Sequence, residues 1–467
     1  MPDPILALDL GTSSTKGLLV GSAGEVLAAH SASYPTHTPC PGHAEQDPGE
    51  VMAAVREVLA ALGGPDTDVV LSCAMHTLVP VGSDGAPLGR VWTWADRRAA
   101  PEAAELRSGP RAPGLHARTG TPLHASSPLC KLRHLQRVEP ARFAAAARFV
   151  SLKELVVEAL TGERCVDHAV ASSTGLLDVH RREWDREALE LAGVDAAHLS
   201  PLVPTDRALP AGGGARSVVV GSTDGALANL GVGADDSRTV CITLGTSGAV
   251  RVVYSEPRTD PTGQRFCYVV DATRYVVGGA LNNGGLVLRW LGRLLGGASD
   301  ADLIETAAAV PPGSDGLLLV PTLTGERFPS YRSDLRGIAH GLTLEHDRGH
   351  LVRAGLEGVM LAVAPLFDAL RAEAAVEPEV RIGGGLVEFP FCRQMLADVL
   401  GCPVHMPASR DSSALGAARL GFAALGRPAD WPIEMAHTHE PDPGRHRLYR
   451  ELRQRRGLLE AAQGEWC

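Results

Sequence analysis

Short apolar runs alternate with longer amphipathic segments along the whole chain. Runs such as residues 5–10, 69–73 and 239–244 have the length and aliphatic content of buried strands. Segments such as 48–62 and 349–374 instead carry apolar residues at helical spacing. Strands interleaved with helices in both halves predict an α/β fold with mixed sheets. Further strands are predicted at 16–20, 26–30, 217–220, 251–254, 275–277, 317–320 and 380–382, and further helices at 129–138, 152–160, 286–295, 391–400 and 414–425.

The phrase Leu-Gly-Thr-Ser occurs twice, each time between two apolar strands. Its glycines are Gly11 and Gly245, so the copies are 245 − 11 = 234 residues apart in a chain of 467. A strand, a small hydroxylated turn and a second strand form a hairpin whose tip exposes N–H groups and hydroxyls, which suit phosphate oxygens. Either hairpin alone is compatible with an ordinary turn. Two at half-chain spacing predict two related domains that bind one polyphosphate.

The two copies differ two residues before the glycine, where the first has Asp9 and the second has Thr243. Mg²⁺ is usually held by one or two carboxylates together with phosphates and water. The sequence therefore predicts that Asp9 faces the cation of a Mg²⁺-nucleotide.

Two further segments place chemistry after a strand. The strand at 217–220 ends in a Gly-Ser-Thr turn followed by Asp224, which predicts a carboxylate at the sheet edge where α/β proteins bind ligands. Such a carboxylate can accept a hydroxyl proton during phosphoryl transfer, and the alternative is that it only caps a helix. Gly383, Gly384 and Gly385 follow the strand at 380–382 and either let a ligand approach the backbone or form a tight turn.

Polar residues at other strand or loop ends suggest a sugar site. Trp94 stands near Asp96, Arg97 and Arg98, and an indole face beside charged groups suits a polyol. The arginines either bind a substrate carboxylate or form a solvated helix start. His76 follows the strand at 69–73, although a lone histidine there is more often a buried structural residue. Asn282 and Asn283, between glycine pairs, either bind a ligand or form a turn. Residues 106–127, rich in Gly, Pro, His and Ser, predict a surface excursion or a lid.

Composition excludes several classes of function. The net charge of −10 and the lack of a basic run argue against nucleic-acid binding. Nine cysteines without a Cys-x-x-Cys pair predict reduced thiols in a cytoplasm and no zinc site. The first residues do not resemble a signal peptide, and the longest apolar stretch, 358–370, is shorter than a membrane span. The P-loop pattern is absent, as is a Gly-x-Gly-x-x-Gly that opens a helix after a strand. We expect a soluble cytoplasmic protein with no nucleic-acid or membrane partner.

The order of these motifs resembles the FGGY family of carbohydrate kinases, and most closely its gluconokinase branch, from residue 5 to about residue 425. Residues 9–16 are similar to the family's phosphate hairpin, 74–76 to its sugar-binding turn, 94–98 to its Trp-x-Asp-x-Arg segment and 221–224 to its catalytic aspartate motif. Residues 279–285 before Trp290 resemble gluconokinases in particular. Residues 324–329 with 336–337, 341–357 and 383–385 resemble the Gly-Glu-Arg-x-Pro block, the second signature and the adenosine-binding turn. The first signature keeps Lys131 but has His134 where Trp is usual, Ala339 replaces a large apolar residue in the second signature, and residues 386–389 depart from the usual sequence after the glycines.

This resemblance implies two duplicated actin-like (ribonuclease H-like) domains, residues 1–233 and 238–467, with ATP and Mg²⁺ in the cleft between them. It also implies transfer of the γ-phosphoryl group to a sugar hydroxyl. Asp224 is then the general base and Asp9 the metal-side carboxylate. The implied phosphate contacts are Gly11, Thr12, Ser13, Lys16, Gly245 and Thr246, the adenosine contacts Gly384 and Gly385, and the sugar contacts Met75, His76, Trp94 and Asp224.

The expected acceptor is a small sugar or sugar acid, with gluconate preferred and a pentulose such as xylulose or ribulose as the alternative. Outside the enzyme class, the chain could be a non-catalytic actin-like nucleotide sensor or a chaperone-like ATPase. The presence of both Asp9 and Asp224 favours the enzyme, and Met75, His76 and Trp94 favour a sugar pocket over simple ATP hydrolysis. Whether the protein forms a homodimer is left open.

Overall fold

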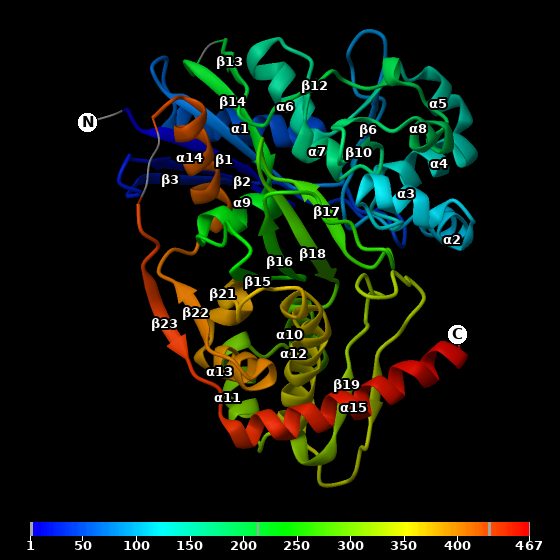
Figure 1. The fold of residues 1–467 in the computed structure, drawn as a ribbon, viewed down its shortest axis with the longest axis vertical. Coiled ribbons are helices and arrows are strands. Elements are labelled where there is room, and N and C mark those ends of the chain that lie inside the picture. Colours follow the sequence, from blue (N-terminus) through cyan, green and yellow to red (C-terminus); the bar gives the residue numbers. More distant parts are fainter. Residues whose placement is uncertain (1–2, 213, 428–430, 467) are drawn as a thin grey trace. The chain divides into compact units, whose positions relative to one another are not determined.

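The computed structural model describes residues 3–212, 214–427 and 431–466, with side chains described as far as residue 462 (Figure 1). The chain forms two compact units, each built from separate segments. Unit 1 contains Met1–Asp235, Val253–Val277 and Asp411–Pro432, and unit 2 contains Asp236–Val252, Gly278–Arg410 and Ile433–Cys467. The predicted division into duplicated domains at 1–233 and 238–467 stays a prediction.

Unit 1 is centred on a six-stranded mixed sheet with the order β13-β14-β5-β1-β2-β3. The first hairpin runs antiparallel, and two later strands join β1 in parallel. Parallel strands that follow a hairpin bring segments far apart in sequence to one sheet edge. The strands are β1 (Ile5–Leu10), β2 (Ser14–Val20), β3 (Val26–Ser33), β5 (Asp68–Cys73), β13 (Ala208–Pro210) and β14 (Ser217–Thr223).

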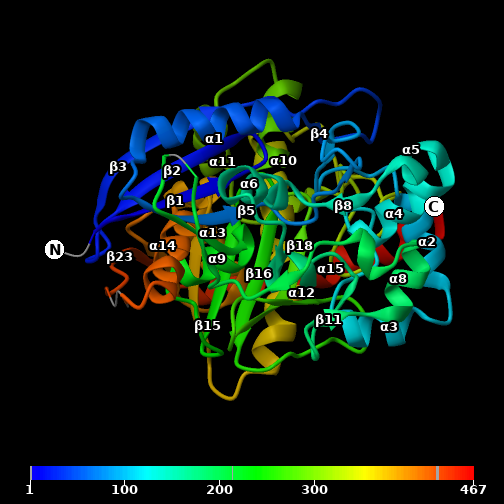
Figure 2. The ribbon, with the colours of Figure 1, turned by 90° about the horizontal axis from the view of Figure 1, so that it is seen from above.

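Helices cover both faces of this sheet (Figure 2). α1 (Pro48–Leu62) spans the predicted residues and begins at Asp47, whose carboxylate accepts hydrogen bonds from two amides of the first turn. A Cβ at Gly17 would collide with Val58 of α1, so the helix lies close on the β2 backbone. Leu6 of β1 lies on the same face as Gly17, below α1, and the preceding Ile5 points to the opposite face, because neighbouring residues of a strand point to opposite sides. On that face α14 (Ser412–Ala424) packs over the sheet, with Gly421 close to Ile5.

A layer of helices occupies residues 100–200 of unit 1, and it corrects one prediction. Residues 106–127 are not an irregular loop, because they contain the end of α2 (Ala100–Ser108), the whole of α3 (Ala112–Thr119) and a buried segment from 119 to 127. Their role as a lid stays a prediction. Of the prolines in this segment, Pro113 stands in the first turn of α3, where a missing N–H costs no hydrogen bond.

The remaining elements of unit 1 are short. The helices are α4 (Pro128–Val138), α5 (Pro140–Ala145), α6 (Leu152–Thr161), α7 (His168–Ser172), α8 (Arg186–Ala192) and α9 (Asp224–Gly231). The strands are β4 (Glu45–Gln46), β6 (Val79–Val81), β7 (Val91–Trp92), β8 (Arg148–Val150), β9 (Val166–Asp167), β10 (Leu177–Asp178), β11 (Glu183–Trp184), β12 (Leu202–Val203) and β17 (Phe266–Val269).

The second large sheet repeats the arrangement of the first. Its seven strands have the order β17-β18-β16-β15-β21-β22-β23. β15 pairs antiparallel with β16 and parallel with β21, as β1 does with β2 and β5. The predicted α/β class and the internal duplication are therefore confirmed. The strands are β15 (Thr239–Leu244), β16 (Gly248–Tyr254), β18 (Tyr275–Leu281), β21 (Glu379–Gly383), β22 (Val404–Pro407) and β23 (Met435–His439).

Unit 2 is otherwise helical around α12 (Arg348–Ala372). This helix is long and apolar enough to cross a membrane by length and composition, but 78% of that stretch is buried inside the fold. It also carries the buried ion pair between Arg353 and Glu357, as expected of a core helix in a globular unit. The other elements are α10 (Gly285–Leu294), α11 (Asp300–Ala308), α13 (Pro390–Leu400), α15 (Pro443–Trp466), β19 (Leu318–Val320) and β20 (Ile338–His340).

The start of α6 in unit 1 carries a buried carboxyl group. The hydroxyl of Ser151 accepts a hydrogen bond from the amide of Glu154 at 3.2 Å, and the Glu154 carboxyl accepts one from the Ser151 amide at 2.5 Å. Burial raises the pKa of Glu154 from 4.5 to about 7, against the effect of these hydrogen bonds. The folded protein therefore holds a proton here that the unfolded chain releases between these pH values.

We expect this proton to make stability depend on pH. The folded state binds more protons than the unfolded state between about pH 4.5 and 7, so the free energy of unfolding falls as pH rises through that window. Glu154→Gln cannot titrate, so the wild type should lose on the order of 2–3 kcal/mol relative to this variant from pH 4.5 to 7. Urea unfolding of both proteins at matched pH values measures the difference. Parallel stability curves would contradict the prediction.

Candidate functional site

The carboxyl ends of three parallel strands in unit 1 lie in register. Asp9 of β1 stands beside Ser72 of β5, and Ser72 stands beside Ser222 of β14. The amide of Ala74 donates to the Leu10 carbonyl at 3.0 Å, which holds the loop after β5 against the end of β1. Gly11, Thr12 and Ser13 follow β1, Met75 and His76 follow β5, and Asp224 follows β14, while Asp9 and Lys16 lie within β1 and β2 and Trp94 follows β7 of a separate two-stranded sheet. Ligands of α/β sheets bind at such edges.

The tip of the first hairpin has its carbonyl groups occupied. The Gly11 carbonyl accepts hydrogen bonds from the Tyr34 hydroxyl at 2.8 Å and from the Gln46 amide at 3.1 Å. The same Gln46 amide donates to the Thr12 carbonyl at 2.8 Å, and the Tyr34 N–H donates to the Ser13 carbonyl at 3.0 Å. Among the described residues, the N–H groups of Thr12 and Ser13 have no protein partner. A tip whose N–H groups have no protein partner suits an anion.

The carboxylate of Asp9 lies at the base of this tip. The Ser72 hydroxyl donates to it at 2.6 Å. Burial raises the pKa of Asp9, and the Ser72 hydrogen bond and the Lys16 charge oppose that rise. Lys16 itself contacts the carboxylate of Asp411, just before α14, and this second acid raises the pKa of Asp9 further. Asp411 carries no motif of its own, so the sequence did not indicate it.

The backbone before Asp224 depends on a glycine. β14 has a bulge between Val219 and Ser222, where Gly221 adopts a φ of 75°. A Cβ on Gly221 would lie 1.8 Å from the Leu71 carbonyl oxygen, so no other residue fits there. Bulges of this kind re-aim the residues that follow them.

Asp224 is the first residue of α9 and is half-buried. The N-cap position belongs to Thr223, whose side chain makes no capping hydrogen bond. The Asp224 carboxylate accepts a hydrogen bond from the Gly225 amide at 2.8 Å. Asp224 therefore stands at the sheet edge without being the cap residue of the helix.

The turn after β5 has a strained conformation at His76, whose φ is 64°. Its Nδ1 lies 2.7 Å from the Ser173 carbonyl, and its ring meets Tyr268 of β17 edge-on at 5.9 Å. His76 is 8% exposed, and the preceding Met75 is half-buried. The histidine is thus oriented by a backbone partner, and Tyr268 is a neighbour that the sequence did not indicate.

Trp94 connects the predicted sugar side to the hairpin tip. Its indole Nε1–H donates to the Thr12 hydroxyl at 2.9 Å. The bond joins residues 82 positions apart, so it is set by tertiary packing alone. The structure brings Trp94, Thr12 and the strand edge together within unit 1.

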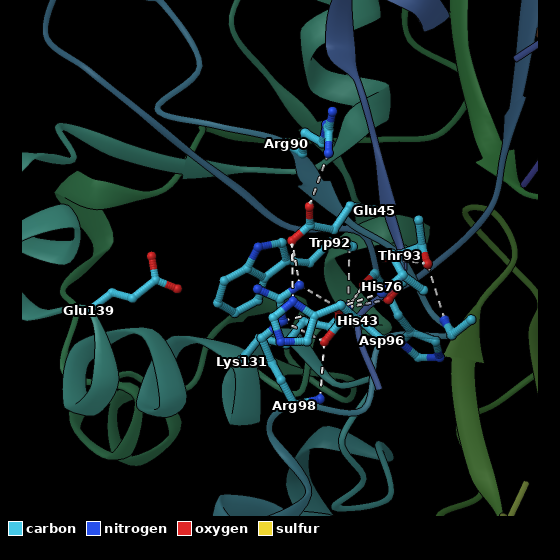
Figure 3. Close-up of polar contacts among 12 residues, drawn as sticks. His43, Glu45, His76, Arg90, Trp92, Thr93, Asp96, Arg98, Lys131 and Glu139 are labelled. Atoms are coloured by element: carbon cyan, nitrogen blue, oxygen red, sulfur yellow. Dashed lines mark hydrogen bonds and ion pairs between the residues drawn. The ribbon is translucent and has the colours of Figure 1, made fainter. Parts of the chain in front are cut away.

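Asp96 and Arg98 form a closed internal network, shown in Figure 3. Asp96 is fully buried and accepts hydrogen bonds from the backbone amides of Ala44 at 2.9 Å and Arg98 at 3.1 Å, and from the Arg98 guanidinium at 2.7 to 3.0 Å. Arg98 also contacts Glu45 and stacks over Trp92 at 4.0 Å from the ring centre. Its side chain is 7% exposed. Arg98 is therefore neither a substrate contact nor part of a solvated helix start, which corrects both sequence interpretations of this residue.

In unit 2, the start of α10 packs on the tip of the second hairpin. The Gly285 amide donates to the Gly245 carbonyl at 2.7 Å. The Thr246 carbonyl accepts from the amides of Gly284 and Leu286 at 3.2 and 3.1 Å. The Thr246 N–H has no partner within the described part of the chain. The second tip therefore repeats the first, with occupied carbonyls and an N–H that has no partner among the described residues.

The glycine turn after β21 lies against the same tip. Gly384 has a φ of 97°, and a Cβ there would lie 2.6 Å from the Leu244 carbonyl and 2.9 Å from the Gly245 nitrogen. A Cβ built on Gly385 would meet no atom within 4 Å. Gly384 is thus required for close packing, and Gly385 borders open space where a flat ligand group could approach.

Asn282 and Asn283 hold a neighbouring loop. The amide of Asn282 donates to the Thr324 carbonyl at 3.1 Å, and that of Asn283 donates to the Gly325 carbonyl at 2.9 Å. The Asn283 oxygen accepts from the Thr324 backbone at 3.3 Å. Of the two sequence interpretations, the structure supports the one in which these residues fix local structure.

Comparison with known proteins gives consistent matches over the whole chain. The FGGY family of carbohydrate kinases matches with its N-terminal domain at residues 4–212 and its C-terminal domain at residues 240–425. The chain is similar to the gluconokinase of Bacillus subtilis (strain 168), with 35% identity over 485 residues, 97% of this chain and 94% of the relative. It is also similar to the xylulose kinase of Klebsiella pneumoniae, with 30% identity over 96% of this chain and 97% of the relative.

Two solved structures from Lactobacillus acidophilus have the same fold. A gluconate kinase superposes with a TM-score of 0.92 at 29% identity and covers 99% of both chains. A ligand-bound xylulose kinase also gives a TM-score of 0.92 at 29% identity, with 99% of this chain and 100% of that chain covered.

Proposed function

Because the chain belongs to the FGGY family of carbohydrate kinases, we propose that it transfers the γ-phosphoryl group of ATP to a hydroxyl of D-gluconate, which gives 6-phosphogluconate. The carbohydrate kinase class follows from family membership, and ATP is the phosphoryl donor that a kinase uses. The observation that supports the site most strongly is the shared strand edge of unit 1. There an anion-binding tip, the His76 turn and the Asp224 carboxylate come together.

In this proposal Asp224 is the general base. Its carboxylate accepts the proton of the sugar hydroxyl as that oxygen attacks the γ-phosphorus, which requires positioning more than covalent chemistry. The exposed N–H groups of Thr12 and Ser13, with Gly11 and Lys16, bind phosphate oxygens. Gly245 and Thr246 have the same role at the second tip, and Gly384 and Gly385 lie along the adenosine.

The donor set suits Mg²⁺ held mainly by the nucleotide. Within the residues that the structure describes, no three His, Cys, Asp or Glu side chains are grouped closely enough to hold a metal ion. Mg²⁺ is commonly bound by one or two carboxylates plus phosphates and waters, which matches the single carboxylate of Asp9 beside the phosphate tip. The cation would neutralise charge on the transferred phosphoryl group, and Asp9 would orient it.

Met75, His76 and Trp94 are the proposed sugar contacts. His76 is presented in a fixed orientation, and Trp94 is tied to the phosphate tip through Thr12. We propose Arg97 as the partner of the substrate carboxylate, because the guanidinium of Arg98 contacts Asp96 and Glu45. A bidentate guanidinium is the usual partner of a carboxylate.

The second candidate is a pentulokinase, because the xylulose kinase structure superposes as well as the gluconate kinase structure. A coupled ADP-release assay across gluconate, xylulose, ribulose and glycerol separates the two. We expect kcat/KM for gluconate to exceed that for each neutral sugar by at least ~10-fold, because a neutral sugar cannot form the bidentate hydrogen bonds that a guanidinium makes with a carboxylate. A higher kcat/KM for a pentulose would reassign the acceptor. ADP release that no acceptor stimulates would favour the sensor or the ATPase.

The cellular setting is part of the same proposal. The eight cysteines of the described residues are free thiols, which suits a reducing cytoplasm. We also propose that the protein acts on a small molecule without nucleic-acid or membrane partners. A homodimer is the oligomeric state to test.

A further inference from the structure

Lysine is rare in this chain, and its few positions are informative. Of the 44 basic Lys and Arg residues only three are lysines, namely Lys16, Lys131 and Lys153. Lys16 follows the phosphate tip, while Lys131 and Lys153 are 0% and 2% exposed. Arginine therefore supplies nearly every basic side chain on the surface, whereas two of the three lysines, Lys131 and Lys153, are buried. The two cations differ, because an ammonium is compact and presents three tetrahedral donors whereas a guanidinium is a planar fork.

The ammonium of Lys131 on α4 is surrounded by backbone carbonyls (Figure 3). It donates to the carbonyls of His76 at 2.6 Å, Thr93 at 2.7 Å and Trp92 at 3.3 Å. Three carbonyls match the three N–H bonds of an ammonium. Burial lowers the pKa of Lys131 to about 7, and the Asp96 carboxylate opposes this decrease. All three bonds go to backbone carbonyls, so Lys131 fixes the backbone conformation at His76 and at residues 92–93 and does not depend on their side chains.

These carbonyls belong to the two segments that carry the proposed sugar contacts. His76 is a sugar contact itself and keeps a left-handed φ of 64°, which costs energy unless its surroundings hold it. Thr93 directly precedes Trp94, and Trp94 donates to Thr12 of the phosphate tip. Lys131 therefore connects the turn at His76 to the segment at Thr93 and Trp94, which is hydrogen-bonded to the phosphate tip.

Lys153 on α6 binds the backbone just before Asp224, as Lys131 binds the backbone at His76. Its ammonium donates to the Asp167 carboxylate at 2.8 Å and to the Ser222 carbonyl at 3.1 Å. Ser222 lies at the bulge of β14, two residues before Asp224. Burial raises the pKa of the Cys73 thiol, the Lys153 charge lowers it, and the charges of Asp224, Asp9 and Asp167 raise it further.

We propose that Lys131 and Lys153 are positioning residues with different roles. Lys131 holds the turn at His76, which contacts the sugar, and Lys153 holds the end of β14, which is followed by Asp224. The inference rests on the proposed function, since it takes His76 and Trp94 as sugar contacts and Asp224 as the base. Reaction rates depend steeply on such placement, because small displacements of reacting groups cost much of the advantage of proximity.

The test compares two variants that each remove one buried ammonium. Lys131→Met removes the donors to the three carbonyls. Lys153→Met alone would leave Asp167 buried and unpaired, so it is combined with Asp167→Asn, which keeps an oxygen acceptor for the amides of Ala169 and Val170. Each variant serves as the matched control for the other, because both lose a buried lysine of unit 1. Circular dichroism and thermal melting first establish that both are folded.

We expect the two variants to change different kinetic constants, KM for gluconate in one and kcat in the other. Lys131→Met should raise KM for gluconate by at least ~10-fold and change KM for ATP by less than about 3-fold. The Lys153→Met/Asp167→Asn variant should lower kcat by at least ~10-fold and change KM for gluconate by less than about 3-fold. Lys131→Arg should behave like Lys131→Met, because a guanidinium is larger than an ammonium and its planar donors do not match the tetrahedral arrangement at this fully buried position.

Four outcomes would count against the inference. Equal changes of kcat and KM in both variants, or wild-type kinetics in either folded variant, would show that the lysines only fill the core. Full activity of Lys131→Arg would show that charge alone matters at that position. The wild type is assayed across the acceptor panel in parallel, and the variants are then assayed with its best acceptor. A wild type that phosphorylates no acceptor would overturn the proposed function and this inference with it, whereas an active wild type with unseparated losses overturns the inference alone.

Discussion

Replacing Asp224 by Asn should lower kcat for phosphoryl transfer by at least ~10²-fold and leave the binding of ATP and sugar nearly unchanged. The carboxylate stands at the common edge of β1, β5 and β14, after the bulge at Gly221. An amide of the same shape can still accept the hydrogen bond from the Gly225 amide, so the start of α9 should be preserved. What the amide cannot do is accept the hydroxyl proton in the transition state.

Steady-state kinetics with gluconate, together with calorimetric titration of each ligand, measures both parts of this expectation. Asp84→Asn is a suitable control, because Asp84 is an exposed aspartate that likewise accepts a hydrogen bond from a nearby amide. That variant should retain wild-type kcat. A nearly normal kcat in folded Asp224→Asn would remove Asp224 from the chemistry.

The strands and their tips could be predicted because their signals are local. A run of aliphatic residues followed by Gly-Thr-Ser specifies a strand and a turn without reference to the rest of the chain, and both copies fold as hairpins. The parallel addition of β5 to β1 and of β21 to β15 then follows from the duplicated order of strands and helices. Local pattern and repetition therefore sufficed for the framework that carries Asp9, His76 and Asp224.

The contacts that orient those residues could not be predicted in the same way. Lys16 meets Asp411, 395 positions away, and nothing in the sequence around Asp411 marks it. Lys131 binds backbone carbonyls. Because every residue has a backbone carbonyl, the residue types in the sequence do not indicate which residues Lys131 binds. Arg98 illustrates the opposite error, since an arginine beside an aspartate looks the same whether it binds a ligand or closes an internal pair.

Composition also misled where position within an element mattered. Residues 106–127 are rich in Gly and Pro, which are frequent in loops, yet Pro113 stands in the first turn of α3 and Gly120 ends that helix in a left-handed conformation. These are the positions at which the two residues favour helices. The segment could have been assigned from the order of its residues, which places the proline before the glycine.

Removing the carboxylate of Asp9 should change the cation requirement more than any other property. The two hairpins are alike in their occupied carbonyls and in N–H groups without a partner among the described residues, but only the first has an acid at its base, where the second has Thr243. If one cation accompanies the polyphosphate, one carboxylate is enough to orient it. Asp9→Ala should therefore raise the half-saturating Mg²⁺ concentration by at least ~10-fold and lower kcat by a similar factor, with KM for the sugar within about 3-fold of the wild type.

The second hairpin supplies the matched control for that experiment. Thr243 occupies the position of Asp9 in the repeat and accepts a hydrogen bond from Arg251 at 3.0 Å. Thr243→Ala removes a polar group of the same place in the fold without removing a charge. Magnesium titrations at saturating ATP and sugar should then separate the two variants, with the requirement shifted only in Asp9→Ala. If both variants shift equally, the tip geometry and not the carboxylate governs the cation, and if neither shifts, Asp9 has no metal-side role.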